Sequence, residues 1–128
     1  MSDLQKLYAN RFSDREEERK NGIWRELCRY LRRYLPEEPD IVVDVAAGYC
    51  DFINNIGIGR RRFAVDANPA VAEYAGNGVT AYVGDVERMA EHFEKGSVSI
   101  FFMSNFLEHI SKEKIERLLR TEYELLLD

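Results

Sequence analysis

"IVVDVAAGYCDF", Ile41 to Phe52, is the stretch of sequence that decides the fold. It begins with a nearly continuous apolar run that holds one acid, Asp44, as in a strand covered on both faces. The run leads into a turn with one glycine, Gly48, where loops that bind nucleotide cofactors usually carry three. The stretch therefore predicts a buried strand that ends at a candidate ligand-binding loop.

Three more apolar runs follow along the chain: "RRFAVDA" (61–67), "VTAYVGD" (79–85) and "SVSIFFMS" (97–104). They are rich in Val, Ile, Phe and Tyr and are bounded by Gly, Asn, Ser or charged residues, which is typical of strands. Segments suited to helical turns separate them, and a longer helix is expected to begin at Ser111. Strict alternation of strand and helix predicts an α/β fold, a Rossmann-like parallel sheet of about four strands with flanking helices.

Residues 1–36 predict an N-terminal helical segment in front of an α/β core over residues 41–128. Ser13 and Glu16 have the spacing of a capping box, and we expect the helix to be interrupted or weakened near Asn21-Gly22. Apolar residues recur along one side of this helix and are expected to be buried: Ile23, Leu27, Tyr30, Leu31 and Tyr34. The last helix carries a similar stripe, made of Ile115, Leu118, Leu119, Tyr123 and Leu126.

The composition favours one domain over the 128 residues, because a 45% hydrophobic content suffices for a core of this size. The net charge of −5 gives no general attraction to phosphate backbones or anionic lipids, so neither nucleic acid nor a membrane is an expected partner. Cys28 and Cys50 lack metal-ligand spacing, so reduced thiols and no metal site are expected. Since no apolar run approaches the roughly 20 residues that span a bilayer, a soluble cytoplasmic protein is predicted.

The residues just after each predicted strand form the candidate site, because ligands of such sheets lie outside the carboxyl ends of the strands. Asp66 follows Asp44 by 22 residues, and its two carboxylate oxygens suit the two hydroxyls of a ribose. Asp85 follows the third strand and could accept a hydrogen bond from an exocyclic amine of a purine, with the Val86 amide donating to the ring. The fourth strand leads into "SNFLEH".

In this order of parts the chain resembles the class I S-adenosylmethionine-dependent methyltransferases, from Ile41 to roughly Leu127. The matching segments are "VVDVAAGYCDF", "FAVDANP", "AYVGDVERM" and "SVSIFFMSNFLEHI". The resemblance implies a strand order of 3-2-1-4 and S-adenosylmethionine as the cofactor. The resemblance further implies that the methionine end is held by Asp44, Ala46, Ala47 and Gly48, beside Tyr49. The ribose would be held by Asp66, Ala67 and Asn68, and the adenine by Asp85 and Val86. The sulfonium side would be lined by Ser104 and Asn105.

The loop departs from the family pattern at Ala46 and Cys50, where glycine usually stands. An alanine at position 46 fits if its φ stays negative, whereas a side chain at position 50 costs about 1 kcal/mol if the left-handed region is required. A dinucleotide-binding oxidoreductase is the nearby alternative, but its G-x-G-x-x-G would fall on Ala46, Gly48 and Asp51. The motif therefore favours the methyltransferase-like interpretation.

His109 is the candidate general base, because methyl transfer needs one only when the acceptor arrives protonated and histidine titrates in the suitable range. The alternative is that Glu108 and His109 simply lead into the helix that begins at Ser111. His92 is expected to be structural or exposed. Tyr8, Phe12 and Trp24 are candidates for a partial lid over the cofactor, or else for aromatic packing under the helices.

The resemblance also implies an absence, because family members continue with further strands that complete the sheet and much of the substrate pocket. We therefore expect a truncated form of the fold whose fourth strand, Ser99 to Met103, is an apolar edge that soluble proteins normally cover. The chain would be a fragment of a longer enzyme, or a short protein that pairs this edge in a homodimer. The predicted function is methyl transfer to a small-molecule or glycan-like acceptor, and the alternative is a non-catalytic binding or assembly module.

Overall fold

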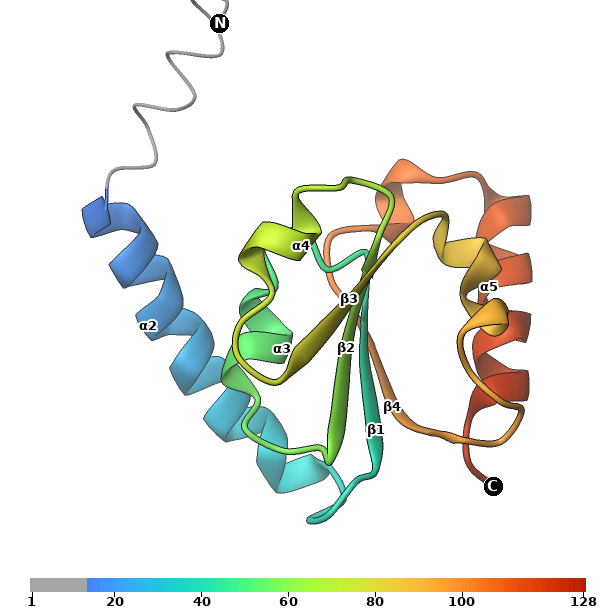
Figure 1. The fold of residues 1–128 in the computed structure, drawn as a ribbon, viewed down its shortest axis with the longest axis horizontal. Helices are drawn as coiled ribbons and strands as arrows, with labels where there is room; N and C mark the ends of the chain where they lie inside the picture. The colour runs from blue at the N-terminus through green and yellow to red at the C-terminus, as the bar shows by residue number, and fades with distance from the viewer. Residues whose placement is uncertain (1–13) are drawn as a thin grey trace, which may run out of the picture.

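The computed structural model describes residues 14–128. Its elements alternate along the chain as the sequence predicts (Figure 1). In order they are α2 (Asp14–Leu31), η1 (Arg32–Tyr34), β1 (Ile41–Val45), α3 (Asp51–Asn55), β2 (Arg61–Asp66), α4 (Val71–Tyr74), β3 (Val79–Val83), η2 (Val86–Glu91), β4 (Val98–Met103), η3 (Leu107–His109) and α5 (Lys112–Leu125).

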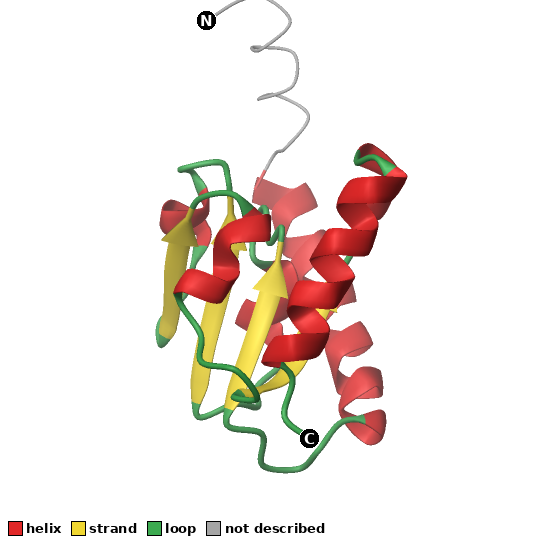
Figure 2. Cartoon of the chain, turned by 90° about the vertical axis from the view of Figure 1, so that its right-hand side faces the viewer, coloured by secondary structure: helices red, strands yellow, loops and turns green. Residues whose placement is uncertain are grey.

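The four strands form one parallel sheet in the order β3-β2-β1-β4, which confirms the predicted fold. All five residues of β1 are buried, because β1 lies between β2 and β4 and both faces of the sheet are covered by helices. The strand arrows point in one direction with helices in front of and behind the sheet (Figure 2). This arrangement explains why β1 is apolar at every position except Asp44.

Helices cover both faces of the sheet, and each face has its own hydrophobic cluster. On one face, α2, α3 and α4 pack over β1, β2 and β4 through a cluster that includes Cys28, Phe52 and Val71. On the other face, η2 and α5 pack through a cluster that includes Met89 and Leu118. The layers of helix, sheet and helix hold the carboxyl ends of all four strands together at one edge of the molecule (Figures 1 and 2).

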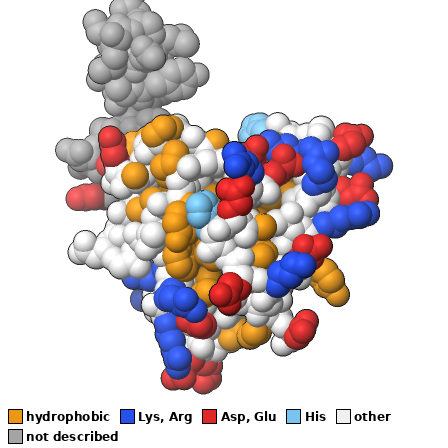
Figure 3. Space-filling model, turned by 45° about the vertical axis from the view of Figure 1, so that its right-hand side comes forward, with side chains coloured by type: hydrophobic (Ala, Val, Ile, Leu, Met, Phe, Trp, Pro, Cys, Tyr) orange, Lys and Arg blue, Asp and Glu red, His pale blue; other side chains and the backbone are white. Residues whose placement is uncertain are grey.

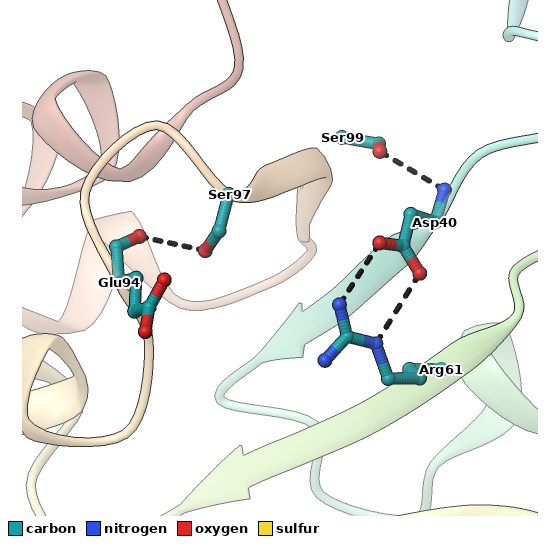
Figure 4. Close-up of polar contacts among 5 residues, drawn as sticks. All are labelled: Asp40, Arg61, Glu94, Ser97 and Ser99. Carbon is teal, nitrogen blue, oxygen red and sulfur yellow. Dashed lines mark hydrogen bonds and ion pairs between the residues drawn. The ribbon is translucent and has the colours of Figure 1, made fainter.

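At the opposite, amino end of the sheet, polar contacts tie the strand starts together (Figure 4). The Arg61 guanidinium donates to both carboxylate oxygens of Asp40, at 3.2 and 2.9 Å, and this holds the pKa of Asp40 below its usual range. The Asp40 N–H donates to Ser99 Oγ at 3.1 Å. Asp40 therefore links the segment before β1 to β2 and to β4, far from the carboxyl ends.

The N-terminal helix differs from the prediction in two ways. It runs without a break through Asn21-Gly22, so the expected interruption there is wrong. Its buried side is formed by Cys28 with the half-buried Trp24 and Leu31, whereas Ile23, Leu27 and Tyr30 are exposed, as is Tyr34 in η1. The helix carries two adjacent apolar stripes, and its docking on the sheet buries the stripe of Trp24, Cys28 and Leu31 and leaves the rest of the predicted stripe exposed. Ser13, the predicted cap, lies outside the described residues.

The last helix shows a related difference. Leu118, Leu125 and Glu122 are buried against the sheet, while Leu119 and Tyr123 of the predicted stripe are exposed. Ser111 begins the helix as predicted, since its Oγ accepts a hydrogen bond from the Lys114 N–H at 3.2 Å. Both long helices therefore have more apolar surface than the described chain covers.

The unbroken helix at Gly22 makes a prediction about stability. A Cβ at position 22 would meet no atom within 4 Å, so Gly22→Ala removes the backbone freedom of glycine without a clash. We expect the free energy of unfolding to rise by about 0.5–1 kcal/mol, measured by urea titration. Gly59→Ala is the control, because its φ is +111° and its Cβ would lie 2.8 Å from Val42 Cγ2, so it should destabilise. A loss of stability in Gly22→Ala would contradict the continuous helix.

Candidate functional site

The predicted site residues gather where the four strands end. Asp44 lies near the end of β1, Asp66 ends β2, Asp85 follows β3 and Ser104 follows β4. The parallel order β3-β2-β1-β4 places these ends along one edge of the sheet, next to the loop of residues 46–50. The sheet therefore brings together parts of the chain that are far apart in the sequence.

The loop after β1 is held in an unusual backbone conformation. Ala46, Gly48 and Cys50 all have positive φ, at 55°, 55° and 61°. The condition under which alanine was expected to fit is therefore not met, because the backbone at position 46 takes the left-handed region that glycine would favour. The fold tolerates a Cβ at two of the three left-handed positions of this loop.

The Cys50 side chain does not project toward the strand ends. It is fully buried in the cluster under α3 and α4, with its Sγ 3.8 Å from the Val71 carbonyl oxygen. Burial raises the pKa of this thiol to about 12, so it stays protonated and unreactive. Ala46 packs with the cluster on the opposite face of the sheet. Both side chains are thus accommodated by packing against the protein itself, and the departure from glycine costs backbone strain.

Asp66 connects the loop after β1 to the turn after β2. Its Oδ2 accepts a hydrogen bond from the Gly48 N–H at 2.9 Å, and its Oδ1 accepts one from the Asn68 N–H at 2.8 Å. The Asp66 carbonyl oxygen accepts a third, from the Gly84 N–H after β3 at 2.9 Å. One acid therefore fixes three of the four strand-end segments relative to one another.

Asp44 is a buried acid beneath this loop. It is 4% exposed, and its Oδ2 accepts a hydrogen bond of 3.3 Å from the Ile53 N–H in α3. Burial raises the pKa of Asp44 to about 8, the Ile53 N–H opposes the rise, and the nearby Asp51 and Asp66 add to it. The carboxyl is therefore largely protonated at neutral pH, and a cation brought close to it would favour its charged form.

Asp85 and Val86 lie at the start of η2. Asp85 caps this helix, with its Oδ1 accepting from the Glu87 N–H at 2.9 Å and the Lys114 Nζ 3.9 Å away. The Val86 side chain is buried in the core, so only its backbone can take part in a surface site. The capping role was not expected from the sequence.

The segment after β4 carries Ser104, Asn105 and His109. Asn105 has a positive φ of 57°, and Ser104 is half-buried. His109 ends η3 with its side chain 72% exposed and its Nε2 3.5 Å from the Glu108 carboxylate. His92, expected to be structural or exposed, is exposed and stacks on Tyr82 with ring centroids 4.0 Å apart.

A cavity of about 560 Å³ lies on the outer side of the loop, between α2, α3 and α4. Its lining includes Tyr49 and Tyr74, whose rings meet edge to face at 4.9 Å, and Lys20, which lies 4.3 Å from the Tyr49 ring centroid and 3.1 Å from Asp51 Oδ2. Tyr74 and Lys20 were not predicted as site residues. They are distant from the loop in sequence, and the docking of α2 and α4 on α3 brings them to it.

Trp24, one of the lid candidates, packs under α2. Its ring meets Phe102 edge to face at 6.0 Å, and Phe102 stacks on Phe52 at 3.8 Å. Trp24 therefore belongs to the aromatic packing under the helices, which was the alternative to a lid. Tyr8 and Phe12, the other two candidates, lie outside the described residues.

Neither a metal-binding group of side chains nor a membrane-spanning helix is found in the part of the chain that the structure describes. Residues 14–128 contain no group of three or more His, Cys, Asp or Glu side chains placed to hold a metal ion. Over the same residues, no helix combines the length and the apolar character needed to cross a bilayer. On the face drawn in Figure 3, acidic and basic side chains are interspersed.

The strained loop makes a prediction for Ala46. Replacing it by glycine relieves a left-handed strain of about 1–2 kcal/mol and adds about 0.5–1 kcal/mol of backbone entropy cost. Ala46→Gly should therefore raise the free energy of unfolding by up to about 1 kcal/mol. The matched control is Ala47→Gly, which lacks a positive φ to relieve and should only destabilise. Equal losses of stability in both variants, measured by urea titration, would show that position 46 is not strained.

The two buried acids make a prediction about pH. The pKa values of Asp44 and Glu122 are raised by burial to about 8 and about 7, so the folded chain keeps protons that the unfolded chain releases above about pH 4. Their contribution to stability is complete below about pH 4 and is lost as the pH rises toward 7 to 8. In the double variant Asp44→Asn, Glu122→Gln, the free energy of unfolding should fall less steeply with pH than in the wild type. The difference in slope is at most about 1.4 kcal/mol per pH unit for each acid. An unchanged slope between pH 4 and 8 would contradict the buried, protonated state.

Comparison with known proteins finds a match in structure alone. No protein-family model and no curated protein sequence matches the chain. Among solved structures, it is similar to a SAM-dependent methyltransferase from Archaeoglobus fulgidus, with 23% identity and a TM-score of 0.64 over 80% of this chain and 48% of that chain. An S-adenosylmethionine-dependent methyltransferase from Mesorhizobium loti matches with 23% identity and a TM-score of 0.58 over 77% and 47%.

A third similar structure is phosphoethanolamine N-methyltransferase 1 of Haemonchus contortus, in complex with phosphoethanolamine and S-adenosylhomocysteine. It has 18% identity and a TM-score of 0.64 over 76% of this chain and 22% of that chain. Identities this low establish the fold and leave the chemistry to be argued from the site. The chain therefore has the α/β fold of S-adenosylmethionine-dependent methyltransferases, and it spans about half of the length of the first two of these solved chains.

Proposed function

We propose that this chain binds S-adenosylmethionine and takes part in methyl transfer to a small-molecule or glycan-like acceptor. The observation that carries the proposal is the 2.9 Å hydrogen bond from the Gly48 N–H to Asp66 Oδ2. It joins the loop after β1 to the acid after β2, at the edge of the sheet where ligands of this fold class bind. The cofactor of the structurally similar enzymes has an amino-acid end and a ribose, which need these two parts side by side.

The residues at this edge suit such a ligand. A carboxylate offers about four acceptor sites, so Asp66 keeps acceptor capacity for ribose hydroxyls beyond its bonds to Gly48 and Asn68. Gly48 is exposed, and a Cβ added there would meet no atom within 4 Å, which leaves room above the loop. Asp44 lies beneath the loop, where the ammonium of a methionine end would stabilise its charged form.

The remaining site residues receive their roles from their places along the edge. Ala46, Ala47 and Tyr49 would flank the methionine end, Ala67 and Asn68 the ribose, and Asp85 with the Val86 backbone the adenine. Ser104 and Asn105 would face the reacting side. When bound, the cofactor supplies a methyl group already activated by its sulfonium, so the protein mainly orients the partners and excludes water.

His109 is the proposed general base for an acceptor that arrives protonated. Its side chain is 72% exposed, so it can take a proton from an acceptor and pass it to solvent, and its Nε2 lies 3.5 Å from the Glu108 carboxylate. The cavity beside Tyr49 has about 560 Å³, a size suited to a small molecule, and it supports the choice of acceptor class.

A non-catalytic assembly module is the second candidate. The observation that favours it is the apolar surface that α2 and α5 leave exposed, which a module held in a larger assembly would cover. The two candidates differ in their affinity for the cofactor, because an assembly module has no need of the strand-end acids.

Calorimetric titration with S-adenosylmethionine and S-adenosylhomocysteine tests the proposal. We expect both to bind, and Asp66→Asn to weaken binding by about 10-fold to 100-fold, the usual value of hydrogen bonds to a charged group. Asp40→Asn is the matched control, because this acid lies at the amino end of the sheet and should leave the affinity unchanged.

Three outcomes would contradict the proposal. Absence of binding at millimolar ligand would favour the assembly module. Tighter binding of NADH than of S-adenosylmethionine would favour the dinucleotide-binding alternative. An unchanged affinity in Asp66→Asn, with the variant folded by circular dichroism, would remove the ribose role of Asp66.

A further inference from the structure

The outer side of β4 is open. On its inner side, β4 pairs with β1 along its length. Within residues 14–128, its other side is met only at Val98, which forms a parallel bridge with Leu126 and accepts a 2.8 Å hydrogen bond from the Leu127 N–H. From Ser99 to Met103, the described chain supplies no strand partner on that side, so the sheet can be extended there.

The helices beside this edge carry most of the exposed apolar surface. Of the ten large apolar side chains that are exposed in the described residues, seven belong to α2, η1, α5 and the residues after α5. They are Ile23, Leu27, Tyr30, Tyr34, Leu119, Tyr123 and Leu127. We call these seven residues the edge patch. Tyr123 is 80% exposed, and apolar side chains gathered in this number on neighbouring helices are typical of a surface that a partner covers.

On α2, the patch faces away from α3 and toward the open side of β4. On the side of α3, the Asn21 side chain accepts a hydrogen bond from Asn55, and Arg32 donates one to the Ile56 carbonyl oxygen. Trp24 contacts Phe102 of β4. At about 100° per residue, Leu27 and Ile23 continue around the helix past Trp24, away from Asn21 and Arg32. This stripe therefore borders the edge of the sheet.

On α5, the patch has the corresponding position on the other face of the sheet. Arg117 bonds to Glu87 of η2 at 2.9 Å, which marks the side of α5 that faces the rest of the domain. At about 100° per residue, Leu119 and Tyr123 lie on the opposite side of the helix from Arg117, and the bridge between Leu126 and Val98 places the end of α5 beside the outer side of β4. A depression of about 310 Å³ between Leu119, Tyr123 and three charged neighbours could receive a side chain.

A buried polar atom lies beneath this part of α5. Glu122 is 5% exposed, and its Oε1 has no hydrogen-bond partner among the described residues. A buried oxygen without a donor costs free energy. The incomplete strand pairing and the apolar stripes occur together at one edge of the sheet.

We propose that β4 pairs with β4 of a second copy across a twofold axis, so that the two sheets become one. Paired strands lie about 4.8 Å apart, so pairing at β4 brings the face of each sheet that carries α5 next to the same face of the copy. Leu119 and Tyr123 then pack against the same residues of the copy, and α2 packs against α2 on the other face. Since Leu126 and Leu127 occupy the start of β4, the pairing uses its later residues, Phe101 to Met103.

The charges around the patch favour a second copy over a strongly charged partner. The exposed side of α5 presents Glu116, Arg120 and Glu124 at successive turns, and Arg120 already pairs with Glu116 at 3.3 Å. Such alternating signs suit an antiparallel contact between identical helices, since each arginine can face a glutamate of the copy when the helices are offset by one turn. The patch therefore has the self-complementary character that a twofold contact needs.

Sedimentation equilibrium tests the inference. We expect the wild-type chain to sediment at twice its mass of 14.9 kDa at micromolar concentration. Leu119→Glu and Tyr123→Ser should sediment as monomers, because the first buries a charge in the contact and the second removes its largest ring. Val83→Glu is the matched control, since Val83 is 48% exposed, close to the 46% of Leu119, but lies on β3 at the other edge.

A second measurement locates the contact. Amide hydrogen exchange in β4 should be slower in the wild-type dimer than in the Tyr123→Ser monomer, since pairing protects the open side of the strand. A monomeric wild type would overturn the inference, as would dimers that persist in both α5 variants, open-ended oligomers, or equal exchange in β4. Tyr123 is so exposed that its replacement should leave the fold intact, which circular dichroism checks.

Discussion

The carboxylate of Asp66 is the constraint on which the strand-end architecture depends. Its two oxygens accept hydrogen bonds from the N–H groups of Gly48 and Asn68, and the backbone carbonyl oxygen of the same residue accepts one from the Gly84 N–H. Three segments that the sheet only brings near one another are thereby fixed in place. A charged acceptor satisfies two backbone donors at once, and such charge-assisted bonds are stronger than neutral ones. The loop after β1 keeps its left-handed residues because this acid and the packing of Cys50 determine its path.

The loop of residues 46–50 has a strained backbone that packing in the core holds in place. Ala46 and Cys50 take backbone conformations that glycine would adopt at lower cost, and their side chains pack into opposite clusters of the core. The departure from a glycine-rich loop is therefore accommodated inside the protein, and the space above Gly48 stays open. A cofactor site in this chain would rest on three left-handed residues held by one surface acid above one buried acid, Asp44.

The strands and their alternation with helices could be predicted from the sequence, because four short apolar runs separated by polar segments have few other solutions. The strand order came from the resemblance, and the sheet confirms it. The sequence could not show the φ of Ala46, the two bonds of Asp66 or the burial of Glu122, since each depends on contacts made across the fold. The exposed stripes were predicted as buried because periodicity identifies an apolar side without showing what covers it. Those same stripes, Leu27 on α2 and Tyr123 on α5 among them, border the open strand.

The most direct test of the account is an amide chemical-shift map recorded with S-adenosylhomocysteine. The account predicts that the amides of Gly48, Asn68 and Val86, at the carboxyl ends of the strands, shift together with one dissociation constant. Those of Gly59 and Arg61, at the amino ends, should not move. Shifts confined to the amino ends, or no shifts at millimolar ligand, would contradict the claim that the strand ends joined by Asp66 form a cofactor site.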